Sequence, residues 1–250
     1  MKKQLLLYYN EKEFVAAVWD NSLKVIEKKQ KLDLDIQLSD SEQKNKISDW
    51  ICQERIFKAE YEDYVFCFEG FKQTFVPNEL FQSSSSKDLL KLNFKEIDHD
   101  CDFKRIAELG LVSVFEFPLW LKSLLVIKFP HVSLFHKSVS DLKGIFNYTT
   151  FKEKTYLVRE NDALAIYRVA QGNLLFFNRY KAVNWEDLVY YSLLVLNNEK
   201  ASKENEIFLC NFKDELEVNK MKEFIKSEVG SISKESGFDN FSIKSQRLCV

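Results

Sequence analysis

Glycine and proline are scarce in this sequence, which has 6 glycines and 3 prolines among 250 residues. Glycine lets a loop backbone approach phosphate oxygens closely, because it has no side chain and tolerates unusual dihedral angles. Neither the phosphate-loop pattern GxxxxGK[ST] nor the dinucleotide pattern GxGxxG occurs. The two best-known glycine-dependent nucleotide sites are therefore excluded.

A strong charge of one sign and long apolar runs are also lacking. The formal net charge is -2, so no overall field attracts nucleic acid or an anionic membrane. The apolar stretches fall well below the roughly 20 residues that span a bilayer, and the run near the amino terminus is too short for a signal peptide. We therefore expect a cytoplasmic protein with no integral membrane segment and no nucleic-acid partner.

Paired cysteines are absent as well. Reduced, mostly buried thiols are expected, because the cysteines form an odd set without CxxC spacing and most lie within apolar runs. The hydrolase patterns GxSxG and HExxH are missing too, so we predict no catalytic residue and favour a protein that is not an enzyme. The five cysteines are Cys52, Cys67, Cys101, Cys210 and Cys249.

Two groups of potential metal ligands have spacings that do not favour a metal site. His131 and His136 lie five positions apart around a short apolar run, so their side chains are expected to point to opposite faces. We predict a structural role for His136, with a hydrogen bond to neighbouring backbone. The segment Asp98–Asp102 holds ligand-type side chains, but adjacent residues rarely converge on one ion. We interpret it as a solvated acidic strand end and predict no metal site.

Apolar and aromatic residues are plentiful, at 46% and 14% of the chain, as in a globular protein. The stretch from 172 to 198 shows how they are organised. Leu174–Phe177 is a continuous apolar run, which predicts a strand buried on both faces. Asn184 is a good N-cap, and the apolar residues that follow Trp185 predict a largely buried helix.

The order strand–strand–strand–helix–strand occurs twice, starting near residues 4 and 154. This order predicts an α/β fold in two similar halves, residues 1–150 and 151–250, each a mixed sheet flanked by helices. No clear residue identity links the two copies. The expected strands are 5–9, 14–19, 23–38 and 64–68 in the first half and 155–159, 163–170, 174–177 and 207–212 in the second, with helices after Ser39 or Ser41 and after Asn184.

Further elements are expected between and after these segments. Pro77 suits the start of a short helix, and Ser83–Ser86 reads as an exposed polar loop. The other expected strands are 89–102, 111–117, 132–135 and an edge strand at 241–248, and the other expected helices are 119–129, one ending at 141–146, and 216–229.

Two short motifs carry a family resemblance. They are Val76-Pro77-x-x-Leu80-Phe81 and Glu186-Asp187-x-x-Tyr190-Tyr191, and segments 136–142 and 207–210 occur with them in family order. Over essentially its whole length the chain resembles the uncharacterised bacterial family called domain of unknown function 3822. The resemblance implies an actin-like ATPase (ribonuclease H-like) fold with no established activity. That fold is also similar to the cytoplasmic actin-like modules of pilus and secretion machines.

The resemblance also implies where a nucleotide would bind. Actin-like ATPases hold phosphates at two strand turns, one per half, which typically read Asp-x-Gly, and a glycine-rich loop covers the adenosine. Here the turns are Asn10–Glu13 and Glu160–Asp162, and the third loop reads Lys213–Glu215. None contains glycine, and both turns carry acids that repel a triphosphate unless a metal bridges them. If a nucleotide binds, the candidate residues are Asn10, Glu11, Lys12, Glu160, Asn161 and Asp162.

Three hypotheses follow. The first is a degenerate, non-catalytic actin-like protein that needs no cofactor and binds another protein. The second is a nucleotide-binding ATPase or kinase with atypical phosphate loops, which would use ATP and Mg²⁺ held by Glu11, Glu160 or Asp162. The third is an assembly module at a membrane machine. We favour the first.

Overall fold

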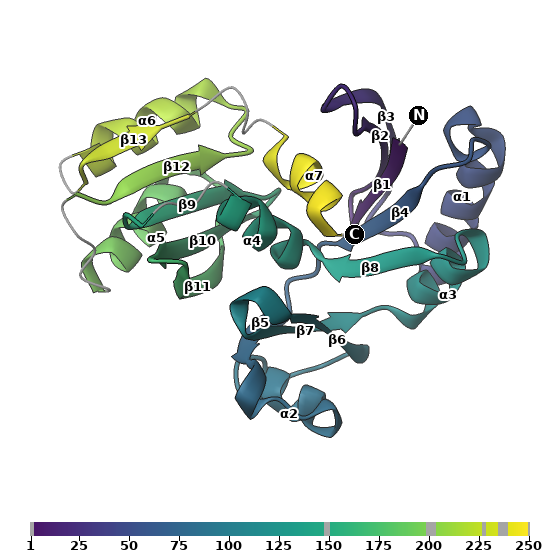
Figure 1. Ribbon diagram of the computed structural model, residues 1–250, viewed down its shortest axis with the longest axis horizontal. Coiled ribbons are helices and arrows are strands. Elements are labelled where there is room, and N and C mark those ends of the chain that lie inside the picture. Colours follow the sequence, from purple (N-terminus) through teal and green to yellow (C-terminus); the bar gives the residue numbers. More distant parts are fainter. Residues whose placement is uncertain (1–2, 148–150, 199–203, 227–228, 235–239, 250) are drawn as a thin grey trace. The chain divides into compact units, whose positions relative to one another are not determined.

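The chain divides into two compact units. The first unit comprises residues 1–143 together with residues 243–250, and the second comprises residues 144–242. The second unit is therefore inserted in the sequence of the first. The computed structural model describes residues 3–147, 151–198, 204–226, 229–234 and 240–249 (Figure 1).

The first unit is built on a mixed five-stranded sheet. The apolar strands β1 and β2 form a hairpin, and β3 continues it antiparallel to β2. Strands β4 and β8 run parallel to β1, so three neighbouring strands end at the same edge of the sheet. The order across the sheet is β3 (Val25–Asp33), β2 (Glu13–Asp20), β1 (Lys3–Asn10), β4 (Asp63–Phe68) and β8 (Val132–His136).

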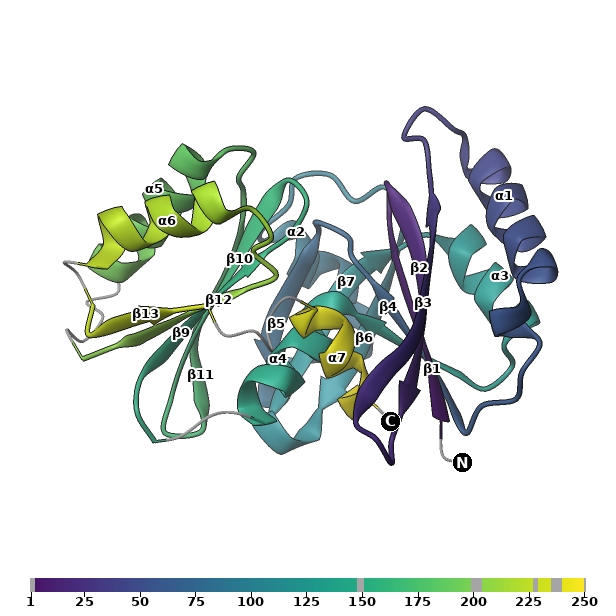
Figure 2. The ribbon, with the colours of Figure 1, turned by 90° about the horizontal axis from the view of Figure 1, so that it is seen from above.

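Helices α1 (Asp40–Gln53) and α3 (Leu119–Lys128) cover one face of this sheet (Figure 2). Ser39 caps α1 as predicted, because its hydroxyl accepts the N–H of Glu42 while the Glu42 carboxylate accepts the Ser39 N–H. Pro118 immediately precedes α3, as predicted. The shared core of strands and helices includes Leu5, Leu7, Phe14, Phe66, Ile47, Ile51, Leu121 and Leu125.

A second, antiparallel sheet is inserted between β4 and β8. It consists of β5 (Gln73–Pro77), β7 (Leu111–Phe117) and β6 (Asp100–Ile106), in that order, and helix α2 (Ser86–Lys91) packs on it. Pro77 ends β5 and a 3-10 turn follows at Asn78–Leu80, so the predicted extended segment and short helix are both present.

Two predictions for this insertion are wrong. Leu89–Asp102 is not one strand, because its first residues belong to α2 and β6 begins only at Asp100. The loop predicted at Ser83–Ser86 is wrong only in part: Ser83 and Ser84 are exposed as expected, but a 3-10 turn leads into α2 and Ser86 is buried. The physical reason is Leu90, which is fully buried in the core of the insertion and draws this segment into a helix.

The second unit has a sheet with the same order of antiparallel and parallel pairings. Helices α5 (Trp185–Asn198) and α6 (Glu215–Ile225) cover one of its faces (Figure 2). The Asn184 side chain caps α5 as predicted, by accepting the N–H of Asp187. The sheet order is β11 (Asn173–Lys181), β10 (Ala163–Ala170), β9 (Lys154–Arg159), β12 (Glu206–Cys210) and β13 (Ser231–Ser233).

Strands β11 and β3 differ from their predictions. The run Leu174–Phe177 was expected to be buried on both faces, but β11 is an edge strand and Leu175 is 52% exposed. A short apolar run does not reveal which place in a sheet its strand takes. Strand β3 ends at Asp33 rather than at residue 38, because the chain turns away there and Leu34 alone returns to the core.

The C-terminal segment is helical, so the prediction of an edge strand at 241–248 is wrong. Helix α7 (Phe241–Gln246) is followed by a 3-10 turn at Arg247–Cys249. Phe241, Ser245 and Gln246 are buried, a spacing that fits a helix and that the mixed polar composition of the segment conceals.

Helix α4 (Lys137–Asn147) begins directly after β8 and confirms the helix expected to end at 141–146. Among the helices that the structure describes, none combines the length and apolar character needed to cross a lipid bilayer.

Candidate functional site

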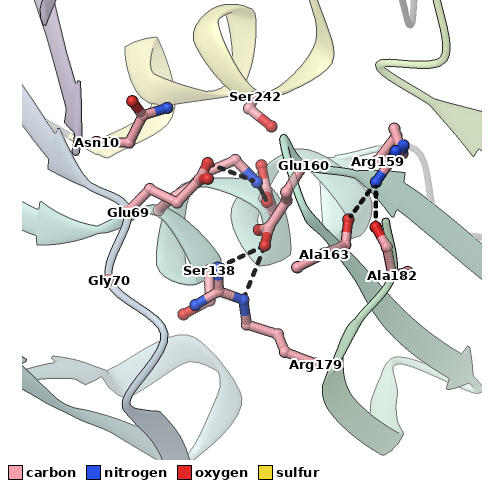
Figure 3. Close-up of polar contacts among 12 residues, drawn as sticks. Asn10, Glu69, Gly70, Ser138, Arg159, Glu160, Ala163, Arg179, Ala182 and Ser242 are labelled. Atoms are coloured by element: carbon pink, nitrogen blue, oxygen red, sulfur yellow. Dashed lines mark hydrogen bonds and ion pairs between the residues drawn. The ribbon is translucent and has the colours of Figure 1, made fainter. Parts of the chain in front are cut away.

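The carboxyl ends of β1, β4 and β8 bring polar side chains together in the first unit. In α/β sheets, ligands bind beyond this edge. Asn10 is the last residue of β1, Glu69 follows β4, and Lys137 follows β8. Asn10 and Glu69 are labelled in Figure 3. This edge is the natural place to look for a ligand site.

The Asn10 side chain fills the turn between β1 and β2. Its Oδ1 accepts the backbone N–H of Lys12 and that of Glu13, each at 2.9 Å, and its Nδ2 donates to the Tyr8 hydroxyl at 2.9 Å. Asn10 is buried, whereas Glu11 is exposed. This is an Asx-type turn, in which a side chain replaces an outside acceptor. The amides that would face a phosphate are therefore already bonded.

A buried ion-pair cluster lies at the ends of the neighbouring strands. The Lys137 ammonium is 2.9 Å from Asp141 Oδ2 and 3.9 Å from Glu69 Oε2. The three side chains are 3%, 0% and 9% exposed respectively. The Tyr8 hydroxyl donates to the Glu69 carboxylate and so joins the cluster to Asn10. The edge therefore holds buried charges of both signs that pair within the first unit.

His136 has a structural role, as predicted. Its Nδ1 accepts the Ser138 N–H at 3.2 Å, so the neutral ring carries its hydrogen on Nε2, which donates to the Gly70 carbonyl at 2.9 Å. A Cβ at Gly70 would lie 2.3 Å from a ring carbon of Phe68, so any larger residue there requires that ring to move. The His136 ring thus ties the segment after β4 to the start of α4.

The acidic segment at 98–102 does not converge on one point. The Asp98 carboxylate pairs with Lys72, and the Asp102 carboxylate is 2.7 Å from the Lys122 ammonium. Among the described residues, no group of three or more histidine, cysteine, aspartate or glutamate side chains is placed to hold a metal ion.

In the second unit, two arginines bond to groups at the turn between β9 and β10 (Figure 3). Arg179 Nε, on β11, donates to Glu160 Oε2 at 2.9 Å, and both side chains are buried. Arg159 donates to the carbonyls of Ala163 and Ala182 at 3.3 and 2.9 Å. The Arg159 guanidinium also makes a bidentate ion pair with the Glu217 carboxylate on α6.

Within their own units, the six nucleotide candidates differ in their surroundings. Asn10 and Lys12 are joined by a hydrogen bond within their turn, and Glu160 is held by Arg179. The other three, Glu11, Asn161 and Asp162, are exposed.

Sequence reasoning missed the residues that hold these turns. Lys137 and Asp141 have the four-residue spacing of a helical ion pair, which was a usable signal. Nothing in the sequence pointed to Tyr8, Glu69, Arg159 or Arg179, whose partners lie 19 to 61 residues away in the chain.

The adenosine loop was expected after β12. The backbone there contains a left-handed residue, a conformation that usually favours glycine, but the residue is an asparagine. Asn211 adopts a left-handed conformation with φ of 63°, which asparagine tolerates better than most residues. Asp214 caps α6 by accepting the Leu216 N–H at 2.8 Å, and Glu215 begins the helix. Two of the three predicted loop residues thus belong to the start of α6.

The strand order of the two five-stranded sheets, together with the helices that cover them, defines an actin-like ATPase fold, as expected. The fold matches a Bacteroides thetaiotaomicron protein described as having an actin-like ATPase fold and unknown function, with 18% identity, a TM-score of 0.84, and coverage of 100% of this chain and 96% of that one. It also matches a chain of the PilM–PilN type IV pilus biogenesis complex, with 8% identity, a TM-score of 0.60 and coverage of 97% and 96%.

A third match is the cytoplasmic domain of EpsL, an inner membrane component of the type II secretion system of Vibrio cholerae, with 10% identity, a TM-score of 0.50 and coverage of 99% and 95%. No match was found among curated proteins. The chain belongs to the family of proteins of unknown function DUF3822, whose model matches residues 1–227. The resemblance noted in the sequence is therefore confirmed.

Proposed function

We propose that this protein is a non-catalytic actin-like module that acts by binding another protein. The observation that carries the proposal is the filled turn after β1. Its two amides are bonded to the Asn10 side chain rather than open to a ligand. A phosphate would have to displace that side chain, at about 0.5–1.5 kcal/mol for each hydrogen bond broken.

Electrostatics oppose phosphate binding in the same place. The Glu69 and Asp141 carboxylates lie buried at this edge, and the exposed Glu11 carboxylate lies in the turn itself. Charges interact more strongly where water is excluded, so a triphosphate would be repelled without a bridging metal.

The second unit supports the same reading. Glu160, one of the acids that could hold a metal, is neutralised by Arg179 through a buried ion pair. Removing the arginine from that pair would leave a buried charge, which is costly. Glu160 is therefore committed to the structure of its turn.

The structural matches agree with a role in assemblies. One of them is a chain of a PilM–PilN complex, and another is a component of a secretion system. These descriptions concern those proteins. They support the proposal because they show that this fold occurs in proteins that act with other proteins. A component of a membrane machine is one kind of partner that fits this proposal.

Nucleotide binding is tested by thermal unfolding of the full chain with and without millimolar Mg-ATP, Mg-ADP and Mg-GTP. We expect no change in melting temperature, whereas a ligand at 100 times its dissociation constant adds about 2.7 kcal/mol of stability. A clear upward shift that Asp162→Ala abolishes and the exposed control Glu186→Ala retains would support a nucleotide-binding ATPase or kinase instead.

Partner binding is tested by affinity purification of the tagged chain from its native cells. We expect one protein to co-purify in near-equal amount and to remain after a salt wash. Absence of any such protein, together with a nucleotide-dependent melting temperature, would refute the proposed function. Separating membrane and soluble fractions of the same lysate distinguishes a partner in a membrane machine from a soluble one.

A further inference from the structure

Helix α5 of the second unit is apolar on more than the face that packs on its sheet. Tyr190 is 60% exposed, and Leu194 is half-buried and lies outside the core of this unit. A helix that is apolar all round is normally buried on both sides. The inner face consists of Leu188, Val189, Ser192, Val195 and Leu196. The outer face of α5 consists of Glu186, Tyr190, Leu194 and Asn197, which follow one another at helical spacing.

The Tyr190 ring is held in place although it is exposed. The Tyr191 ring stacks on the Tyr180 ring of β11, with the ring centroids 4.5 Å apart. The Tyr190 ring then meets the Tyr191 ring edge to face, at 5.1 Å between centroids. An exposed ring that its neighbours already hold loses little freedom when a partner covers it, and tyrosine is enriched among the residues that anchor interfaces. Tyr190 is therefore suited to be such an anchor.

The charge of the outer face has one sign. Helix α5 contains Glu186 and Asp187 but no lysine or arginine. The Asp187 carboxylate accepts a backbone N–H just before the helix at 2.9 Å, whereas Glu186 is exposed and makes no ion pair with a residue that the structure describes. On the side of α5 that faces α6, Lys220 lies over the Trp185 ring and pairs with Glu223. The outer face thus offers an open carboxylate one helical turn from an aromatic ring, and both groups attract a cation.

We propose that the outer face of α5 binds a basic amphipathic helix of a partner protein. This inference rests on the proposed function and names the surface that the partner uses. The apolar side of the partner helix covers Tyr190 and Leu194, because ridges of side chains on one helix fit the grooves of another. A lysine or arginine at its edge pairs with Glu186 and lies against the Tyr190 ring. Acidic segments and anionic membranes are disfavoured, because they carry the same sign of charge as Glu186.

Helix α3 of the first unit provides a matched comparison. Its Ile127 side chain is 72% exposed, more than that of Tyr190. Both charged residues of α3 are lysines, Lys122 and Lys128, so this helix offers no carboxylate to a basic partner. Position 127 therefore tests whether an exposed apolar residue on a surface helix is enough for binding.

The first experiment locates the partner's contact by photocrosslinking. Full-length chains with p-benzoylphenylalanine in place of Tyr190, or of Ile127 as the control, are expressed in the native cells and irradiated. We expect the probe at position 190 to crosslink one protein, within a peptide that combines apolar residues at helical spacing with lysine or arginine. The probe at position 127 should not crosslink that protein.

The second experiment measures affinity with a synthetic, fluorescently labelled peptide that copies the crosslinked segment. Binding to the purified full chain is followed by fluorescence anisotropy at low and high salt. Tyr190→Ala should weaken binding about tenfold or more, as expected for an anchor. Glu186→Lys should weaken it at low salt and remove its salt dependence. The controls Ile127→Ala and Glu60→Lys, which change exposed residues of the first unit, should leave the affinity unchanged. Circular dichroism confirms that each variant is folded.

Three outcomes overturn the proposal. In the first, the probe at position 190 crosslinks nothing, a lipid or a second copy of this chain. In the second, the crosslinked segment is acidic or lacks helical spacing of its apolar residues. In the third, Tyr190→Ala binds the peptide as tightly as the original chain. If affinity purification still recovers a partner, each outcome refutes only the assignment to α5. If no partner is recovered, the proposed function fails as well.

Discussion

Replacement of Lys137 by methionine tests whether the buried cluster stabilises the first unit. The Lys137 ammonium is 2.9 Å from Asp141, whose side chain is fully buried. At an effective dielectric constant of 20, the attraction at that distance is roughly 6 kcal/mol, and desolvation of both groups offsets much of it. Lys137→Met keeps the apolar stem of the side chain and removes the charge, so the Asp141 carboxylate remains buried beside Glu69.

The expected loss is about 3–5 kcal/mol of unfolding free energy, the usual effect of removing one partner of a buried pair. A domain is stable by only about 5–15 kcal/mol, so this loss is a large share. The assay is urea unfolding at pH 7, followed by circular dichroism, with the change read from the midpoint at constant slope.

Lys220→Met is the matched control. The Lys220–Glu223 pair has the same 2.9 Å separation, but its side chains are 31% and 59% exposed. Exposed helical pairs contribute about 0.3–0.5 kcal/mol, so this variant should be almost unchanged. If Lys137→Met lost less than about 1 kcal/mol, or no more than the control, the cluster would not be the stabilising feature inferred from its burial.

Three other changes test single features. Asn10→Ala should lose about 1–2 kcal/mol of unfolding free energy in the same assay, because two turn amides lose their acceptor. The control Asn161→Ala changes an exposed side chain and should lose less than about 0.5 kcal/mol. Equal losses would show that the Asn10 side chain does not stabilise its turn. Gly70→Ala should lose about 1–3 kcal/mol through overlap with Phe68, and an unchanged midpoint would show that the ring moves aside freely. Backbone N–H groups, that of residue 23 foremost, hold the pKa of Asp20 below its usual 3.8. The stabilisation from its charge is therefore present above that pH and lost as pH falls through the lower folded-state pKa. Asp20→Asn keeps an acceptor oxygen but removes the charge, so the variant should be less stable than the original chain at pH 7. The difference in unfolding free energy should shrink as the pH falls. A difference that does not change with pH would show that the charge of Asp20 does not stabilise the fold.

Local signals made much of the fold predictable. The apolar runs of β1 and β2, the Ser39 and Asn184 caps and Pro118 before α3 each act within a few residues, so they can be read from the sequence alone. The same is true of the recurring order of strands and helices, and the actin-like fold that the family resemblance implied is confirmed. The division into halves at residues 150 and 151 stays a prediction.

The errors concern elements that tertiary contacts decide. The burial of Leu90 makes α2 a helix, and the neighbours of β11 make it an edge strand; neither fact is encoded within its own segment. Tyr8, Glu69 and Arg179 likewise meet partners 19 to 61 residues away. The roles of the six nucleotide candidates, and the identity of the partner, stay predictions.

The insertion of the second unit within the first constrains how the protein is made. A ribosome adds about 5–20 residues per second, so residues 144–242 occupy roughly 5–20 s between the synthesis of β8 and that of residues 243–249. During that interval the sheet of the first unit lacks the contacts of residues 243–249, such as that of the Arg247 guanidinium with the Trp19 ring. A chaperone that recognises apolar surface would bind the growing chain in that interval, and the synthesis of residues 243–249 would release it.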